Sequence, residues 1–196
     1  MALPITKPKS LILAGVFSCV YFVAVFGSGM LGIIAPVMML VGWVIGITIN
    51  GIVVMLYIAK VPHVGAFTIL GALVGLGMTL TGHVWYTMLL STPIGLVADL
   101  VARTGSYRRP LANAAAYGVF NQWFIVPLLP ILYNADEYFQ YVAESMNSVD
   151  YAEKMRALFS PTLIFSWTIV VFIVSFITAM LGMKMLRTHF ERAGVV

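Results

Sequence analysis

The sequence predicts an all-α integral membrane protein whose helices cross the bilayer about six times. Of its 196 residues, 61% are hydrophobic and 9% are charged, and the mean hydropathy is +1.00. A soluble domain of this size could not bury so much apolar surface, so lipid must cover it. The apolar stretches are long and continuous rather than alternating, which excludes a transmembrane barrel.

Each apolar stretch predicts one helix of a single transmembrane domain that covers residues 1–196. The expected helices span about 11–28, 33–59, 65–81, 84–103, 110–133 and 161–186. The first follows basic residues, as a signal peptide would. It lacks a small-residue cleavage site with a polar region behind it, so we expect it to be retained. The second is long enough to be tilted or broken between Gly46 and Gly51.

The basic residues set the number and direction of the crossings. Nine of the 11 precede the first helix or follow the second, fourth and sixth: Lys7, Lys9, Lys60, Arg103, Arg108, Arg109, Lys184, Arg187 and Arg192. Because Lys and Arg collect in cytoplasmic loops, we expect both termini in the cytoplasm and the protein in the inner (cytoplasmic) membrane. An odd number of crossings would destroy this alternation. Basic residues that stand singly at helix ends also argue against nucleic acid as a partner.

Residues 134–160 form the only long polar stretch, and they hold the other two basic residues with most of the acidic ones. This extracellular loop is expected outside the cell. Its aromatic residues are spaced for one or two short amphipathic helices at the membrane interface. Two interpretations stay open, a plain connector and a lid over a binding site.

The sequence contains no enzyme motif: no Walker-type phosphate loop, no HExxH, no paired intramembrane carboxylates, and no nucleophile with a histidine in register. We therefore expect neither catalysis nor an intrinsic cofactor. Asp99 is the sole candidate for an ion-coupling group, and its place one turn before Arg103 favours a local ion pair or a helix-end contact. Without a coupling group or an ATPase, the chain is expected to be one subunit of a larger assembly.

Small residues on the first helix predict a close approach by another helix. Ala14 and Ser18 form a small-xxx-small pair, and Gly15 with Cys19 repeats it one residue on. A contact with another helix of the same chain would also explain such a pair, and for a small-residue pair alone it is the favoured interpretation. The pairs Gly42 with Gly46 and Gly71 with Gly75 are interpreted as internal contacts.

The outer ends of the helices hold the candidate ligand site. The sequence TGHVWY places His83 with Trp85 and Tyr86 at the outer surface. Tryptophan and tyrosine also serve there as interfacial anchors. The imidazole of His83 suits a metal or a polar ligand, and a solvated turn histidine is the alternative.

The predicted fifth helix adds Asn121, Gln122 and Trp123. Two adjacent carboxamides within an apolar span need partners, which a polar cavity or a helix-to-helix hydrogen bond would provide. Methionines add soft, adaptable surface on the same outer side, namely Met30, Met38 and Met39.

Four short stretches resemble a known family: RTHFERAGVV at 187–196, AKVP at 59–62, TGHVW at 81–85 and GSYRRP at 105–110. Together they resemble the Trep_Strep, or MptD-like, group of S components of energy-coupling factor (ECF) transporters, over nearly the whole chain. The resemblance implies a small six-helix bundle, an ECF S-component-like fold. Such a subunit captures a micronutrient outside and delivers it inward by toppling, driven by a T component and two ATPase subunits that use ATP.

The resemblance also implies two sites. An AxxxA strip on the first helix docks on the T component in such proteins, and Ala14 and Ser18 stand at those positions here, with Gly15 beside them. The second alanine is thus replaced by another small residue. Substrate binds at the outer end, under the loop that joins the first two helices and against the later ones, the side on which His83 and Trp123 are expected.

For the substrate we expect a haem-like tetrapyrrole or metal chelate, because one outer histidine, His83, stands with methionines, many aromatics and few charged groups. His83 would then be the metal ligand. A vitamin such as thiamine, or another aromatic heterocycle, is the close alternative. Two further classes of function stay open: a stand-alone secondary carrier or channel, and a membrane scaffold without a ligand.

Overall fold

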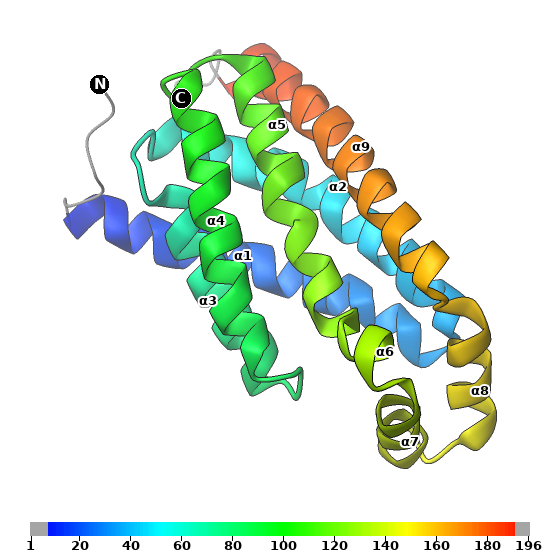
Figure 1. Cartoon of the computed structure of the whole chain (residues 1–196). Helices are drawn as coiled ribbons and strands as arrows, with labels where there is room; N and C mark the ends of the chain where they lie inside the picture. Colours follow the sequence, from blue (N-terminus) through cyan, green and yellow to red (C-terminus); the bar gives the residue numbers. More distant parts are fainter. Residues whose placement is uncertain (1–7, 191–196) are drawn as a thin grey trace.

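The computed structural model describes residues 8–190, whose regular secondary structure is entirely helical (Figure 1). The long helices are α1 (Pro8–Gly29), α2 (Pro36–Lys60), α3 (Ala66–Leu80), α4 (Tyr86–Thr104), α5 (Pro110–Phe120) and α9 (Pro161–Met185). The shorter elements are η1 (Met30–Ile33), η2 (Asn121–Leu128), α6 (Pro130–Tyr133), α7 (Ala135–Ser145), α8 (Val149–Leu158) and the turn η3 (Leu186–Phe190).

Within residues 8–190, three helical segments are long and apolar enough to cross a membrane: Pro8–Ile33, Pro36–Lys60 and Pro161–Thr188. The first and last also expose apolar side chains, and Ile12, Val23 and Ile169 are each more than 60% exposed. Lipid accommodates such a surface and water does not. The prediction of an all-α membrane protein is therefore confirmed.

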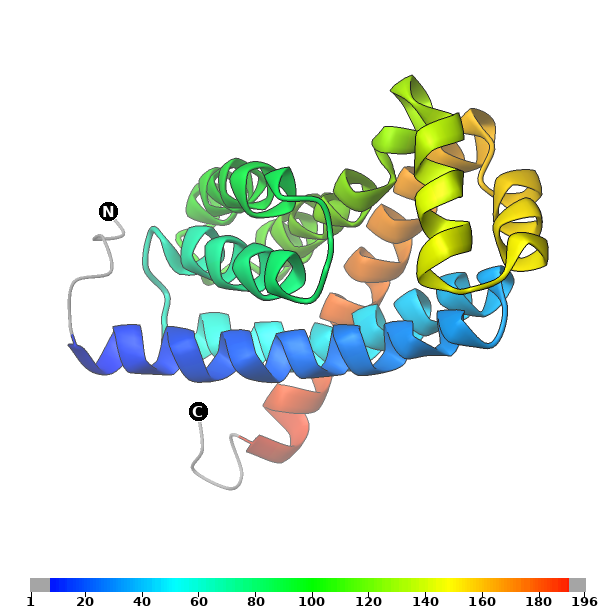
Figure 2. The same cartoon turned by 90° about the horizontal axis from the view of Figure 1, so that it is seen from below.

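The chain runs back and forth six times between two ends of the bundle (Figure 1). One end, which we call the basic end, holds the start of α1, the α2–α3 loop, the α4–α5 loop and the end of α9. The turn η1, the α3–α4 turn and helices α6 to α8 lie at the opposite end, which we call the cap end; Figure 2 shows α7 and α8 there, beside the end of α1. Lys7, Arg192 and most of the C-terminal signature lie outside the described residues.

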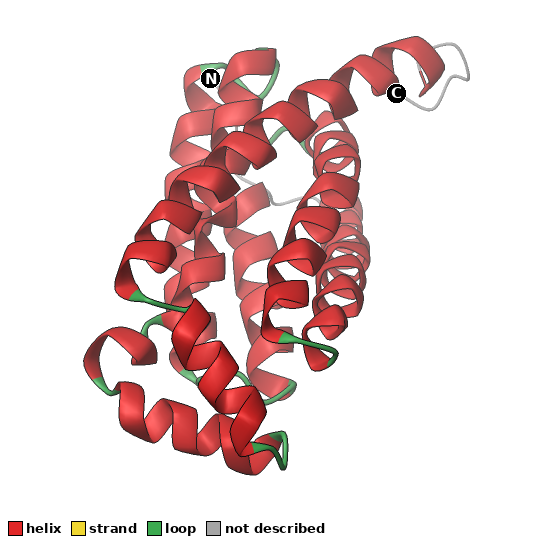
Figure 3. Ribbon diagram, turned by 90° about the vertical axis from the view of Figure 1, so that its right-hand side faces the viewer, coloured by secondary structure: helices red, strands yellow, loops and turns green. Residues whose placement is uncertain are grey.

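The six crossings stay a prediction, since three of the six segments are shorter or less apolar than a typical span. Helix α3 has 15 residues and is about 22 Å long, against a hydrocarbon core of about 30 Å. It packs against α4 and α1, and Figure 3 shows the described helices packed together and joined by short loops. Its sides are thus covered mainly by protein.

Two expected elements differ in the structure. The single helix expected over 110–133 is α5 followed by the 3-10 segment η2 and the short α6. Pro127 and Pro130 lack the amide hydrogen that a continuous α-helix needs, which accounts for the change. Of the two alternatives expected for α2, the break between Gly46 and Gly51 is wrong, because α2 is continuous from Pro36 to Lys60, and the tilt stays a prediction.

The glycines of α2 and α3 let neighbouring helices touch through their backbones. Gly46 lies against Val25 of α1, and a Cβ at Gly51 would be 2.8 Å from the carbonyl carbon of Thr178 in α9. Similarly, a Cβ at Gly75 would be 2.7 Å from the Cα of Met88 in α4. The interpretation of the glycine pairs as internal contacts is confirmed, and packing at small residues is how membrane helices approach closely.

Ala14 and Ser18 are buried inside this bundle, with 0% and 2% of their surface exposed. They therefore cannot form a strip for docking another subunit, and the expectation drawn from them is wrong. The small residues one position on differ: Cys19 is exposed, and a Cβ at Gly15 would meet no atom within 4 Å.

Asp99 holds α3 against α4. Its buried carboxylate accepts hydrogen bonds from the backbone N–H groups of Gly65 (3.1 Å), Phe67 (3.1 Å) and Thr68 (2.8 Å) at the start of α3. The hydroxyls of Thr68 (2.6 Å) and Tyr107 (2.9 Å) donate to the same carboxylate. A negative charge at a helix N-terminus is favourable. The predicted helix-end contact is thus confirmed, although the helix is the neighbouring one.

Candidate ligand-binding site

A cavity of about 220 Å³ lies at the cap end, between α1, η1, α2, the α3–α4 turn, η2 and α8. Three residues expected at the ligand site line it, His83, Trp123 and Met30. They come from three separate parts of the chain, so the fold alone brings them together. We call this space the outer cavity.

Aromatic rings form one wall of the outer cavity. Trp123 and Phe124 stack with their ring centroids 4.4 Å apart, and Trp43 of α2 lies 5.4 Å from Phe124. The indole Nε1 of Trp123 donates a hydrogen bond of 3.0 Å to the hydroxyl of Tyr21, which holds the ring in place. Such a wall suits a flat ligand or a delocalised cation.

His83 supplies a polar group to the lining of the same cavity. Its Nδ1 lies 3.1 Å from the carbonyl oxygen of Met78. Because a carbonyl only accepts, Nδ1 carries the hydrogen and Nε2 is left as the acceptor of the neutral ring. Burial lowers the pKa of His83, an effect that the Met78 carbonyl partly offsets. The ring is therefore neutral at pH 7, and no carboxylate, lysine or arginine is among the described residues that line the cavity.

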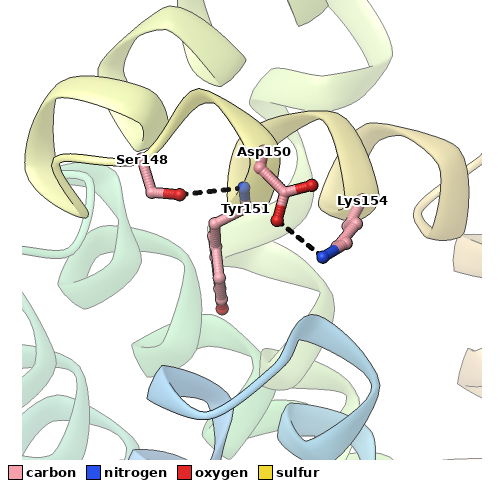
Figure 4. Close-up of polar contacts among 4 residues, drawn as sticks. All are labelled: Ser148, Asp150, Tyr151 and Lys154. Carbon is pink, nitrogen blue, oxygen red and sulfur yellow. Dashed lines mark hydrogen bonds and ion pairs between the residues drawn. The ribbon is translucent and has the colours of Figure 1, made fainter.

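Helix α8 covers the cavity through Tyr151. Its hydroxyl donates a hydrogen bond of 2.6 Å to the carbonyl oxygen of Gly32 in η1, and burial raises its pKa, which keeps the phenol protonated. Figure 4 shows Tyr151 extending from the start of α8, where the Ser148 hydroxyl accepts from the Tyr151 N–H at 3.2 Å. Asp150 and Lys154 pair at 2.6 Å on the same helix. Residues 134–160 form two short helices, α7 and α8, within the expected one or two, and a lid over a binding site stays a prediction.

The other outer residues lie elsewhere. Trp85 and Tyr86 line a separate open groove of about 430 Å³ against α6 and α7, where the hydroxyls of Tyr86 and Tyr133 are 2.9 Å apart. Trp85 is 72% exposed, as an interfacial anchor would be. Met38 is exposed on α2 and is not part of the cavity lining.

Asn121 and Gln122 bond helix to helix instead of lining the outer cavity. The Asn121 Oδ1 accepts from the Tyr21 hydroxyl at 2.7 Å, and its Nδ2 donates to the Ser175 hydroxyl at 2.8 Å. The Gln122 Nε2 donates to the carbonyl oxygens of Gly118 (3.0 Å) and Thr168 (3.3 Å). These bonds join η2 to α1 and α9, close behind Trp123.

Met39, expected on this outer side, lines the cavity as well, but sequence reasoning missed four of its residues: Gly29, Trp43, Phe124 and Tyr151. One signal was present, because Met39 and Trp43 are four residues apart and so share a face of α2. Tyr151 was noticed only as an aromatic residue of the extracellular loop.

Comparison with known proteins gives one match. The sequence model of a family described as hypothetical bacterial integral membrane protein (Trep_Strep) matches residues 8–192. No curated protein and no solved structure matches the chain.

Proposed function

This chain belongs to the Trep_Strep family of bacterial integral membrane proteins, and we propose that it is the substrate-binding subunit of an ECF-type importer. It captures a small aromatic compound in the outer cavity. The observation that carries this proposal is the cavity itself, which has an aromatic wall and a covering helix at the end away from the basic loops. By the distribution of Lys and Arg, that end faces outward from the inner membrane.

The volume of the cavity favours a substrate of one or two rings. A cavity of about 150 Å³ holds benzene, and ligand sites commonly have about 300–1,000 Å³. At about 220 Å³, the outer cavity is small on this scale. A tetrapyrrole has four rings and would enter only if α8 moved away, so the vitamin-like alternative is preferred to haem.

The chemistry of the walls narrows the class further. Trp43 and Trp123 belong to the aromatic wall against which a heterocycle or a delocalised cation would lie. The neutral His83 offers Nε2 as an acceptor for a ligand N–H group. Thiamine, with an aminopyrimidine and a positively charged thiazolium ring, has both features and is the probe of choice.

Energy for import would come from partner subunits, a T component and two ATPases, because the sequence has no phosphate-binding loop of its own. We propose that the T component docks on the lipid-facing side of α1 around Gly15 and Cys19. This docking site takes the place of the one expected at Ala14 and Ser18, which are buried. A helix of the partner would approach closely at Gly15.

Titration of the purified protein with thiamine and, separately, with haemin tests the substrate class. We expect saturable quenching of tryptophan fluorescence by thiamine, since Trp43 and Trp123 line the cavity, and no Soret shift of haemin. A Soret shift that is lost in His83→Ala would show that the substrate is a tetrapyrrole. The absence of a response to any small molecule would favour the interpretation as a membrane scaffold without a ligand.

Reconstitution in liposomes tests the role of subunit. We expect no uptake of the probe by this chain alone under an ion gradient, because none of the described residues lining the cavity carries a charge that would couple to ions. Uptake without partners would show that the protein is a secondary carrier and not the subunit of an importer.

A further inference from the structure

A second and larger hollow, of about 560 Å³, opens at the basic end. Its walls come from the end of α2, the α4–α5 loop, the start of α5 and the end of α9 with η3. In Figure 1 these elements meet at the end of the bundle opposite α7 and α8. The proposed function does not use this space, which we call the inner hollow.

The inner hollow joins positive charge to an apolar wall. Arg108 of the α4–α5 loop and Arg187 of η3 line it, and both are exposed. Methionine and leucine side chains line it as well, namely Met55, Met183 and Leu186. A ligand that fits both parts has an anionic head and a hydrocarbon tail.

Asn113 adds an unused acceptor. This residue lines the hollow and is only 6% exposed. Its Nδ2 donates a hydrogen bond of 3.0 Å to the carbonyl oxygen of Tyr107, but its Oδ1 has no partner. Buried acceptors are normally satisfied, and this Oδ1 is itself enclosed, so a hydroxyl donor of a ligand would reach it once the Asn113 side chain turns toward the hollow.

No carboxylate is among the described residues that line the hollow. Asp99 bonds to one lining residue, Tyr107, whose hydroxyl donates to it at 2.9 Å. As shown above, four further hydrogen bonds tie the same carboxylate to the start of α3. The charged groups that line the hollow itself are thus both positive, Arg108 and Arg187.

We propose that the inner hollow binds one anionic phospholipid of the cytoplasmic leaflet. Its phosphate lies between Arg108 and Arg187, a headgroup hydroxyl donates to the Asn113 Oδ1, and an acyl chain lies along Met55, Met183 and Leu186. Phosphatidylglycerol combines a single phosphate charge with free headgroup hydroxyls. Basic pockets between helices at this depth are typical of such lipids.

Native mass spectrometry of the full chain, with added lipids of identical acyl chains, tests the proposal. We expect phosphatidylglycerol to bind at least tenfold more tightly than phosphatidylcholine. In Arg108→Gln/Arg187→Gln its affinity should fall by about 30-fold, since each cation near the surface contributes about 1 kcal/mol. The matched control Arg103→Gln/Lys184→Gln removes two exposed cations from the same end outside the hollow and should retain binding.

A second pair of measurements tests the hydroxyl. Phosphatidylmethanol carries the same charge without a headgroup hydroxyl, so it should bind more weakly than phosphatidylglycerol, and Asn113→Leu should abolish that difference. Equal binding of phosphatidylglycerol and phosphatidylcholine would overturn the proposal, as would full binding by the Arg108/Arg187 double variant. Displacement of the lipid by millimolar inorganic phosphate would overturn the proposal and indicate that the hollow binds a free anion.

Discussion

Replacing Asp99 by asparagine tests how the first half of the bundle is held together. The carboxylate is fully buried and accepts five hydrogen bonds, three from backbone N–H groups at the start of α3. Asparagine keeps the shape but has one acceptor oxygen, and it directs an NH2 group at the remaining donors.

The magnitude follows from the geometry. If the amide oxygen takes the place of Oδ2, it keeps Gly65 and Thr68 as donors. The amide nitrogen then faces the N–H of Phe67 and the hydroxyl of Tyr107. The Tyr107 hydroxyl can accept from it and donate to the Asp99 backbone carbonyl, 3.2 Å away, so only the Phe67 N–H loses its acceptor. An unsatisfied buried donor costs about 1–3 kcal/mol, and loss of the charge at the helix N-terminus adds about 0.5–1 kcal/mol. We expect the free energy of unfolding to fall by about 3 kcal/mol.

Unfolding in mixed micelles, followed by circular dichroism, measures this change. Hydrogen exchange of the amides at 65–68 locates it, and these amides should lose protection first. Arg103→Gln is the control, because the exposed Arg103 lies one turn away on the same helix and makes none of these bonds. The reasoning fails if Asp99→Asn unfolds like Arg103→Gln, or if α3 keeps its protection.

Two further predictions concern the cavity and the partner. Burial holds the pKa of His83 below the ordinary value of 6.5. The unfolded chain therefore binds more protons below that pH, so stability should fall from pH 7 to 5, and His83→Gln should flatten this slope; an unchanged slope would contradict the burial argument. For the partner, Gly15→Trp should prevent copurification with a T component because it blocks close approach at α1, whereas undiminished copurification would move the docking site elsewhere.

The sequence predicted the helices better than the site, and the reason is physical. Hydropathy and charge are summed over some 20 residues, so the six segments and the two short helices of 134–160 emerge without any tertiary information. The divided segment after Phe120 shows the limit, since the effect of Pro127 and Pro130 depends on how the chain repacks around them.

Side-chain direction could not be predicted at the same level. Asn121 and Trp123 are two residues apart, yet Trp123 lines the outer cavity while Asn121 bonds to Tyr21 and Ser175. Ala14 and Gly15 are adjacent, but a partner helix can reach only the second. In both cases the neighbouring helices decide which face is available, and a single sequence does not contain that pairing.

The outer cavity has a matched pair of test positions on α1. Gly29 lines it, and a Cβ there meets only the Trp43 Nε1 at 3.9 Å, so a larger side chain fits and fills the space. Gly27 lies on the same helix, is exposed and lines no part of the cavity. Gly29→Leu therefore blocks the cavity, while Gly27→Leu makes the same chemical change outside it.

Native mass spectrometry of the gently purified wild type, Gly27→Leu and Gly29→Leu tests the central claim most directly, because it weighs any retained small molecule. If the outer cavity binds the substrate, an adduct with the mass of a one- or two-ring compound is expected on the wild type and Gly27→Leu, and none on Gly29→Leu. The same adduct on all three proteins, or a tetrapyrrole on the wild type, would contradict this claim.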